Sequence, residues 1–216
     1  MRVGADTGGT FTDVVTADGT VVKLPSTPAD PGRAVRLGVE QAITGDATDL
    51  LAHGTTVATN ALLERRGAPV ALVTTEGFAD VIEIARQDRP SLYDPGIVRP
   101  EPLVPRRWRY EVGGRLGADG AEVEPLDRAM VPQIDAEVAA VAVCLLHADL
   151  DPGHERAVAE VLAGRGFDVT CSHEVSPELR EYERTSTTVV NAYLRPLCRS
   201  YLRGLGGLAD EVLVMT

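Results

Sequence analysis

The hydrophobic pattern at the start of the chain has the period of β-strands. Apolar and β-branched residues fill three short stretches, and Asp18-Gly19 between the last two is a typical hairpin turn. Such a pattern predicts an antiparallel meander. The three predicted strands are residues 2–5, 11–16 and 20–24.

The period then lengthens to that of a helix. Pro31 follows Asp30 as a first helical residue follows its N-cap, and apolar residues recur at helical spacing up to Ile43. Residues 50–53 predict a further strand. Residues 56–66 predict a helix that ends at Gly67.

The middle of the chain differs from the rest in composition. After a predicted strand at 70–74 and one or two helical turns at 78–84, residues 86–119 are rich in proline and contain the single tryptophan, Trp108. This composition predicts an irregular excursion at about 86–120. One strand is expected within it, at residues 108–112.

Regular alternation returns beyond Pro125. The run Val138–Leu146 is continuously apolar, which is typical of a parallel strand covered on both faces. Ser176-Pro177-Glu178 predicts a helix start, and Pro196 is expected to kink or split that helix. The resulting β-α-β-α-β order predicts parallel strands joined by helical crossovers. Its other elements are a helix at 151–163 and strands at 167–171 and 211–215.

Composition excludes several classes of partner. The 216 residues carry a net charge of −11, whereas nucleic-acid and anionic-membrane binders usually present a basic field. No apolar run reaches the length of a membrane span, and the first residues lack the apolar core of a secretory signal. The cysteines are few and far apart, which favours reduced thiols and a cytoplasmic protein. They are Cys144, Cys171 and Cys198.

The turn between the first two predicted strands is the first candidate for chemistry. Its two adjacent glycines let a ligand approach the backbone, whose N–H groups can form an anion-binding nest. Asp6 can hold Mg²⁺ through its water shell. The alternative is a glycine-rich turn in which Asp6 is a turn former. The predicted phosphate-and-metal cradle consists of Asp6, Thr7, Gly8, Gly9, Thr10 and Thr12.

A second candidate lies where the predicted strand at 50–53 meets the following helix. Backbone N–H groups face an anion at such a junction, and His53 can act as a general acid or orient a substrate. The alternative is that His53 is a buried strand residue, Thr55 caps the helix and Asn60 bonds the backbone. The expected substrate-binding residues here are Gly54, Thr55, Thr56 and Asn60.

Arginines in the excursion form a third candidate. Arg86 and Arg89, near Asp94, can line a carboxylate-recognising pocket, because arginine binds carboxylates in a bidentate manner. A surface ion-pair cluster is the alternative. No metal site is expected among the histidines and glutamates of residues 147–174, because no close ligand pair occurs there.

Four blocks of the chain resemble one family. MRVGADTGGTFTDVV at the start and residues 53–78, 86–94 and 172–196 are similar to the hydantoinase A/5-oxoprolinase family. That family belongs to the actin, sugar-kinase and heat-shock ATPase superfamily, in which a D-x-G-G-T turn is the first phosphate motif. The resemblance implies an α/β fold of ribonuclease-H-like architecture: a mixed sheet, first an antiparallel meander and then parallel strands, flanked by helices.

The resemblance also implies a reaction. ATP, with Mg²⁺, would phosphorylate the oxygen of a cyclic amide such as hydantoin or 5-oxoproline, and water would then open the ring. Asp13 and His53 are the expected catalytic residues, and a B-type hydantoinase subunit is the expected partner. Two alternatives stay open: a subunit of an ATP-dependent ketone carboxylase, and a non-catalytic scaffold or partner-binding module.

The resemblance finally suggests how the chain is divided. Residues 1–178 correspond to the N-terminal region of the family, and residues 179–216 to the start of the hydantoinase A region, which is truncated. The family's second phosphate motif would follow the last residues. We therefore expect the chain to be the N-terminal portion of a longer subunit.

Overall fold

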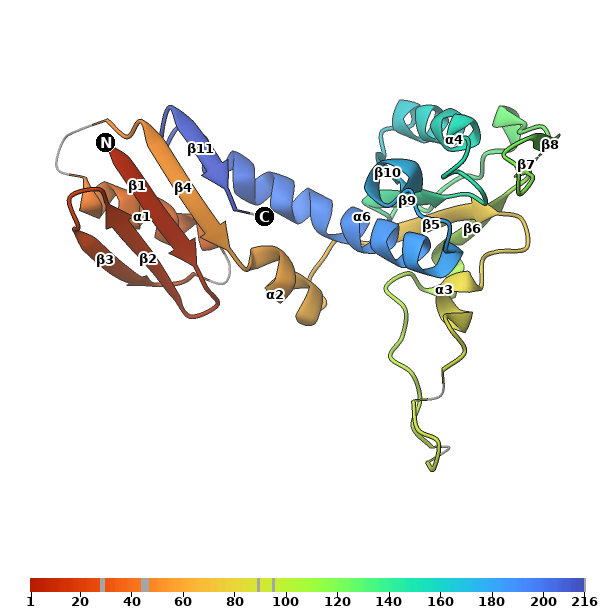
Figure 1. Ribbon diagram of the computed structural model, residues 1–216, viewed down its shortest axis with the longest axis horizontal. Helices are drawn as coiled ribbons and strands as arrows, with labels where there is room; N and C mark the ends of the chain where they lie inside the picture. Colours follow the sequence, from red (N-terminus) through yellow and green to blue (C-terminus); the bar gives the residue numbers. More distant parts are fainter. Residues whose placement is uncertain (28–29, 44–46, 89, 95, 216) are drawn as a thin grey trace. The chain divides into compact units, whose positions relative to one another are not determined.

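The structure is a computed structural model that describes residues 1–27, 30–43, 47–88, 90–94 and 96–215 (Figure 1). It contains two compact units. The first unit consists of Met1–Gly67 and Leu197–Thr216, and the second of Ala68–Pro196. Among the described residues, no helix is both long and apolar enough to cross a membrane.

A five-stranded mixed sheet forms the first unit, in the order β11-β4-β1-β2-β3. Strands β1, β2 and β3 are the predicted antiparallel meander, and β4 lies parallel to β1. Strand β11 lies parallel to β4 on its other side. The strands are β1 (Arg2–Thr7), β2 (Phe11–Thr16), β3 (Val21–Pro25), β4 (Leu50–Thr55) and β11 (Glu211–Val214).

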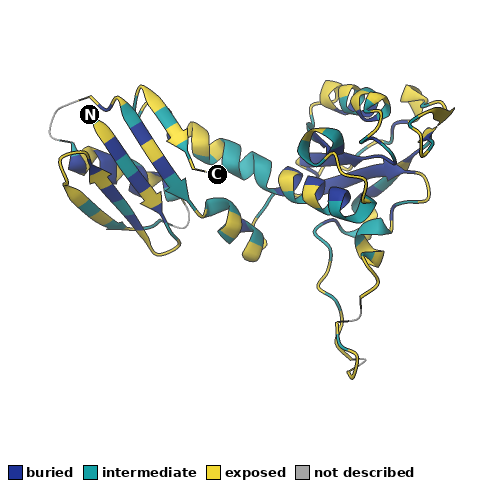
Figure 2. Ribbon diagram, in the orientation of Figure 1, coloured by how far each residue is buried: buried dark blue, intermediate teal, exposed yellow. Residues whose placement is uncertain are grey.

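Burial alternates along the strands of this sheet, as Figure 2 shows. One face packs against helix α1 (Pro31–Ala42), where Gly38 lies so close to the sheet that a Cβ would stand 2.6 Å from Val14 Cγ2. Ala5, Val14 and His53 point to this covered face, whereas Asp6 points to the other one. The core between sheet and helix is Val3, Ala5, Val14, Val35, Val39, Ala42, Leu51 and Leu205.

Local capping rules explain where the helices of the first unit begin and end. Asp30 caps α1 as predicted, because its side chain accepts a hydrogen bond from Arg33 N. Helix α2 (Val57–Leu63) is shorter than predicted and ends before Gly67. Arg65 adopts a left-handed φ of 53°, while the amides of Arg65 and Arg66 bond the carbonyls of Leu62 and Ala61. This Schellman closure uses an arginine where glycine is usual.

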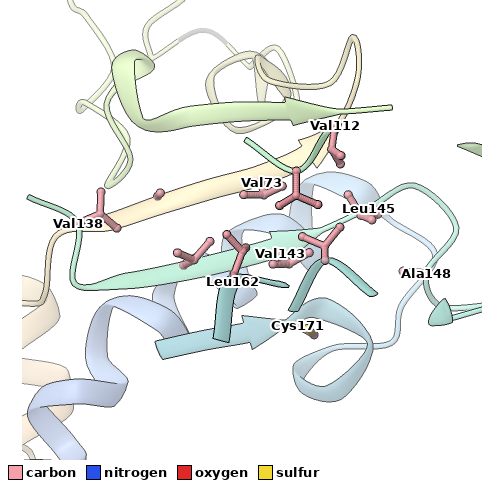
Figure 3. Packing of buried hydrophobic residues seen from close by; sticks show 12 residues of the cluster. Val73, Val112, Val138, Val143, Leu145, Ala148, Leu162 and Cys171 are labelled. Atoms are coloured by element: carbon pink, nitrogen blue, oxygen red, sulfur yellow. The ribbon is translucent and has the colours of Figure 1, made fainter. Parts of the chain in front are cut away.

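The second unit is built on a four-stranded parallel sheet, in the order β10-β9-β5-β6. All residues of β5 and β9 are buried, so the continuous apolar run predicted the burial of both faces correctly. Val158 and Leu162 of helix α4 (Gly153–Gly164) belong to the same core, part of which Figure 3 shows. The strands are β5 (Val70–Thr75), β6 (Arg109–Val112), β9 (Ala140–Cys144) and β10 (Asp168–Cys171).

Shorter elements complete the second unit. They lie before, within and after the predicted excursion, which holds β7 in addition to the one expected strand, β6. They are the helices α3 (Val81–Ile84) and α5 (Ser172–Val175), the 3₁₀ turns η1 (Arg106–Trp108) and η2 (Arg128–Met130), and the paired strands β7 (Arg115–Leu116) and β8 (Glu122–Glu124).

The predicted helix start at Ser176 is wrong. Helix α6 (Glu181–Arg203) begins later, after a non-helical segment. The buried Arg184 guanidinium explains the delay, because its Nη1 donates to the Glu178 carbonyl at 2.8 Å. The same guanidinium also binds the Leu145 carbonyl and the Asp149 carboxylate, so tertiary contacts that hold Arg184 override a strong local signal. Pro196 lies inside α6 and does not split it, although its ring nitrogen has no hydrogen to donate.

The position of β11 also differs from the expectation. The β-α-β-α-β order predicted that this strand would follow β9 and β10 in one parallel set, but it pairs with β4 of the first unit instead. The fold class itself is confirmed: the protein is α/β, with a mixed sheet and a parallel sheet flanked by helices.

Candidate functional site

The turn between β1 and β2 retains two amides that a ligand can use. Gly8 N is occupied within the turn, where it donates to Phe11 O at 3.0 Å. Among the described residues, the amides of Gly9 and Thr10 have no such acceptor. The predicted nest is therefore confined to Gly9 and Thr10, because Gly8 uses its amide to shape the turn.

Ser26, which sequence analysis did not select as a site residue, stabilises the turn through two hydrogen bonds. Its hydroxyl donates to Gly8 O at 2.7 Å, and its amide donates to Thr10 O at 2.8 Å. The buried Thr12 hydroxyl lies 3.1 Å from Ser26 Oγ. Thr7 and Thr12 are both buried, so these two predicted cradle residues lie beneath the turn.

Hydrogen bonds join the turn to the start of α2. Both the amide and the hydroxyl of Thr56 donate to Thr7 O, at 3.2 and 3.3 Å. Asn60 Nδ2 in turn donates to Thr56 Oγ1 at 3.2 Å, and it lies 3.4 Å from where a Cβ on Gly9 would stand. The two candidate segments at 6–12 and 53–60 thus form one continuous site.

Asp6 and Gly54 lie side by side on the exposed face of the sheet. A Cβ on Gly54 would stand 2.9 Å from Asp6 Oδ1, so the glycine leaves room for the carboxylate. Asp13 is the register partner of Asp6 across the β1–β2 pair. Its carboxylate, however, already binds Lys23 Nζ at 2.9 Å.

His53 is on the opposite face from Asp6 and is fully buried. Its Nδ1 lies 3.1 Å from Ala5 O and its Nε2 lies 2.6 Å from Tyr201 Oη. Because a carbonyl can only accept, Nδ1 carries the hydrogen, and Nε2 then accepts from the tyrosine hydroxyl. Burial lowers the pKa of His53, which favours this neutral form. The geometry matches the structural alternative, and a role in proton transfer stays a prediction.

Tyr201 is the functional candidate that sequence reasoning missed. It stands on α6, 148 residues after its partner His53, so no local motif could have indicated the contact. Burial raises the pKa of Tyr201, whose hydroxyl lies among those of Thr7 and Thr55. The Thr55 hydroxyl also accepts from Val57 N at 3.2 Å, but the N-cap of α2 is Thr56 and not Thr55, as the alternative had it.

A pocket of about 580 Å³ opens beside the turn, within the first unit. Residues Thr7–Gly9 form one side of it. The starts of α1 and α2 and the last turns of α6, including Tyr201, form the others. A molecule in this pocket would therefore lie against the turn that carries the free amides.

Arg86 of the third candidate belongs to a different part of the molecule. Arg86 is in the second unit, where it forms an ion pair with Glu183 of α6. Arg89 lies outside the described residues. Asp94 accepts a hydrogen bond from Gly96 N at 2.9 Å. These contacts match the surface ion-pair alternative for Arg86, and its role in substrate binding stays a prediction.

The second unit also contains a buried polar cluster. Ligand atoms of Glu155, Cys171 and His173 lie within 4.8 Å of one another, although the sequence shows no close pair. The two Glu155 oxygens accept hydrogen bonds from Leu145 N, Ser172 Oγ, His173 N and His173 Nδ1. Burial raises the pKa of the Cys171 thiol to about 12. This arrangement holds the carboxylate in a structural role, because its lone pairs are already engaged.

Comparison with known proteins identifies the family. Residues 2–166 match the model of the hydantoinase/oxoprolinase N-terminal region. The chain belongs to this family. The matched range lies within the predicted 1–178 region, whose boundary at 178/179 stays a prediction.

Named relatives agree with the family. The chain is 42% identical to caprolactamase subunit alpha of Pseudomonas jessenii, covering 98% of this chain and 34% of that protein. It is 34% identical to the acetophenone carboxylase gamma subunit of Aromatoleum aromaticum, covering 97% of this chain and 33% of that protein. The crystal structure of the ATP-dependent caprolactamase from Pseudomonas jessenii superposes with a TM-score of 0.83 at 38% identity, covering 99% of this chain and 35% of the other. The chain thus spans about a third of the length of these relatives.

Proposed function

We propose that this chain carries the first phosphate-binding site of an ATP-dependent cyclic-amide hydrolase of the hydantoinase/5-oxoprolinase type. One observation carries the proposal: the hydrogen bonds from Thr56 to Thr7 O make the glycine turn and the α2 start a single site. The similarity to an ATP-dependent caprolactamase supports the same reaction class.

The residues of this site fit a magnesium–nucleotide complex. Mg²⁺ prefers one or two carboxylates together with phosphate oxygens and water, and Asp6 presents an exposed carboxylate beside the small Gly54. Free amides suit phosphate, and Gly9 and Thr10 offer them. We assign Asp6 to the metal and these two amides to phosphate. Bound ATP would supply the phosphoryl group that, once on the amide oxygen, ends the donation of the nitrogen lone pair into the carbonyl and opens the carbon to attack by water.

In this proposal the chain's own residues bind the substrate and hold the two segments of the site in place. Gly54, Thr55, Thr56 and Asn60 place the start of α2 against the turn, and Asn60 offers its side-chain amide to a substrate. His53 acts through Tyr201 rather than by direct contact, since it is buried. Asp13 stays a catalytic candidate because it pairs with Asp6 across the strands. A B-type subunit is the partner we expect for the whole enzyme.

The decisive test is amide-dependent ATP hydrolysis by the complete enzyme carrying Asp6→Asn. We expect kcat/KM for ATP to fall by a factor of about 100 or more, because the substitution removes the charge that attracts the metal. Asp210→Asn, at an exposed position of the same unit, is the matched control and should retain full activity. Undiminished hydrolysis in Asp6→Asn would refute the metal role of Asp6.

The carboxylase alternative has its own support in the acetophenone carboxylase relative. The same phosphate site serves either reaction, so its residues do not choose between them. Product analysis with and without bicarbonate separates the two. A ring-opened amino acid formed without added carbon indicates the hydrolase, and a carboxylated ketone indicates the carboxylase.

A further inference from the structure

Three charged residues form a row across the exposed face of the first sheet. Asp6 of β1 is the register partner of Asp13 of β2, and Asp13 is the register partner of Lys23 of β3. Two carboxylates in directly opposite positions repel each other, because the Cβ atoms of such a pair are only about 5 Å apart. A cation beside them relieves this repulsion. Lys23, which is in that position, is the only lysine of the chain.

Two contacts hold the Lys23 ammonium beside Asp13. Its Nζ lies 2.9 Å from Asp13 Oδ1 and 3.2 Å from Asp13 Oδ2, so it binds both carboxylate oxygens. The same Nζ lies 4.9 Å from the centre of the Phe11 ring, a distance at which an aromatic face attracts a cation. Phe11 precedes Asp13 by two residues and shares its face of β2. Asp13 is therefore paired within the row, while the carboxylate of Asp6 stays exposed.

This pairing sets the charge that a metal ion meets at Asp6. With Lys23 in place the row carries a single net negative charge, whereas two adjacent carboxylates without it would carry two. A pair of free carboxylates can hold a bare divalent cation together with water. A single carboxylate binds Mg²⁺ well only when phosphate oxygens complete the coordination shell. A site with less negative charge also repels the phosphates of a nucleotide less.

We propose that Lys23 is a positioning residue of the nucleotide site, which keeps Asp13 from the metal and thereby makes metal binding at Asp6 depend on bound nucleotide. The inference rests on the proposed function, because it takes Asp6 as the residue that faces Mg²⁺. Lys23 acts through Asp13 and touches neither metal nor phosphate. Its effect is that Asp6 binds a metal–nucleotide complex in preference to a bare divalent cation.

The test is titration of the 216-residue chain with Mn²⁺ in the absence of nucleotide, followed by electron paramagnetic resonance of the free ion. Mn²⁺ is the probe because it takes the same oxygen ligands as Mg²⁺. Lys23→Met keeps an aliphatic side chain and removes the charge, so Mn²⁺ should bind roughly 10-fold more tightly than to the wild type. Unchanged or weaker Mn²⁺ binding by the variant overturns the proposal.

Two control variants test whether the charge at this position is responsible. Lys23→Arg retains the charge, so the affinity for Mn²⁺ should stay within about twofold of the wild type. Arg33→Met removes a positive charge from an exposed position of α1 in the same unit. It should change the affinity by less than about twofold, because salt screens distant surface charges. A gain in Arg33→Met equal to that in Lys23→Met would show a general charge effect and contradict the proposal.

A double variant identifies the carboxylate that Lys23 restrains. Lys23→Met combined with Asp13→Asn removes the freed carboxylate as well, so the affinity for Mn²⁺ should return to the wild-type level. An affinity that stays high would mean that Asp13 is not the added ligand, and would refute the restraint. Circular dichroism checks folding, which these substitutions should preserve because an exposed ion pair adds little to stability. Lys23→Gln replaces Lys23→Met if that variant fails to fold.

The outcome is separate from that of the hydrolysis test, because these titrations omit nucleotide. If Asp6→Asn lowers ATP hydrolysis and Lys23→Met leaves Mn²⁺ binding unchanged, Asp6 keeps its assignment and the role of Lys23 is refuted.

Discussion

The two sheets of this protein differ in how their strands are buried and in where their polar side chains lie. In the first unit burial alternates along β1 and β2, and the exposed face presents Asp6 and Asp13. In the second unit β5 and β9 are buried throughout. Two of its buried polar residues, Glu155 and Arg184, make hydrogen bonds that tie loops and helices to the strand ends. A sheet with one free face can offer chemistry, whereas one covered on both faces provides stability.

The largest effect on stability should follow substitution of Glu155, which is buried beside the sheet of the second unit. Glu155→Gln replaces one carboxylate oxygen with an NH₂ group, so two of the four donors around it lose their acceptor and the free energy of unfolding should fall by about 3 kcal/mol or more. Glu160→Gln, on the same helix but exposed, should change it by less than about 0.5 kcal/mol. Urea unfolding followed by circular dichroism measures both. A loss below 1 kcal/mol in Glu155→Gln would show that the cluster is dispensable.

An intermediate effect on stability should come from titration of His53, on the covered face of the first sheet. The folded-state pKa of His53 is lower than the unfolded value of 6.5. The unfolded chain therefore binds this proton first as the pH falls. Folding stability should decrease below about pH 6.5, by at most about 1.4 kcal/mol per pH unit for one proton.

The variant that isolates this proton is His53→Gln. Its amide keeps a donor and an acceptor but does not titrate between pH 5 and 7.5. The difference between wild type and variant in unfolding free energy, measured by urea titration across that range, should show the acid-side slope. Parallel pH profiles would mean that His53 does not titrate differently in the two states.

The smallest effect on stability should come from the exposed face. In Gly54→Ala the new Cβ meets the exposed Asp6 carboxylate, which can turn away, so stability should change by less than about 1 kcal/mol. Binding of Mg²⁺-ATP by the complete enzyme should nevertheless weaken severalfold. Gly4→Ala is the control, because its Cβ meets only an ordinary contact at 3.8 Å. Equal nucleotide affinity in both variants would contradict the importance of the space beside Asp6.

Sequence analysis predicted correctly those features that depend on a few neighbouring residues. The strand at 11–16 and the Asp30 cap agree with the structure because β-branched runs and capping side chains act over a few residues. The candidate segments at 6–12 and 53–60 were likewise recognisable as motifs. Their mutual contact through Thr56 depends on the parallel pairing of β1 with β4, which local patterns do not specify.

Long-range contacts account for what was missed. Tyr201 reaches His53 only because α6 returns to the first sheet, and Ser26 reaches Gly8 across the meander. Arg184 is held by Leu145 and Asp149, more than 30 residues earlier, and from there its guanidinium binds the Glu178 carbonyl outside the helix that the Ser176 signal favours. Period-two alternation does separate Asp6 from Thr7, so this part of the site's geometry was available from the pattern. The face of the sheet on which His53 lies depends instead on the register between β1 and β4.

The first unit is made of two separate stretches of the chain, with the second unit between them, and this order has a consequence for synthesis. Strand β4 is finished at Thr55, but its neighbour β11 begins only at Glu211, after the whole of the second unit. At ordinary translation rates that neighbour emerges roughly 10 s later. The second unit, in contrast, is continuous in sequence from Ala68 to Pro196. The ribosome therefore delivers every strand of the parallel sheet before it delivers the last strand of the sheet that carries the glycine turn.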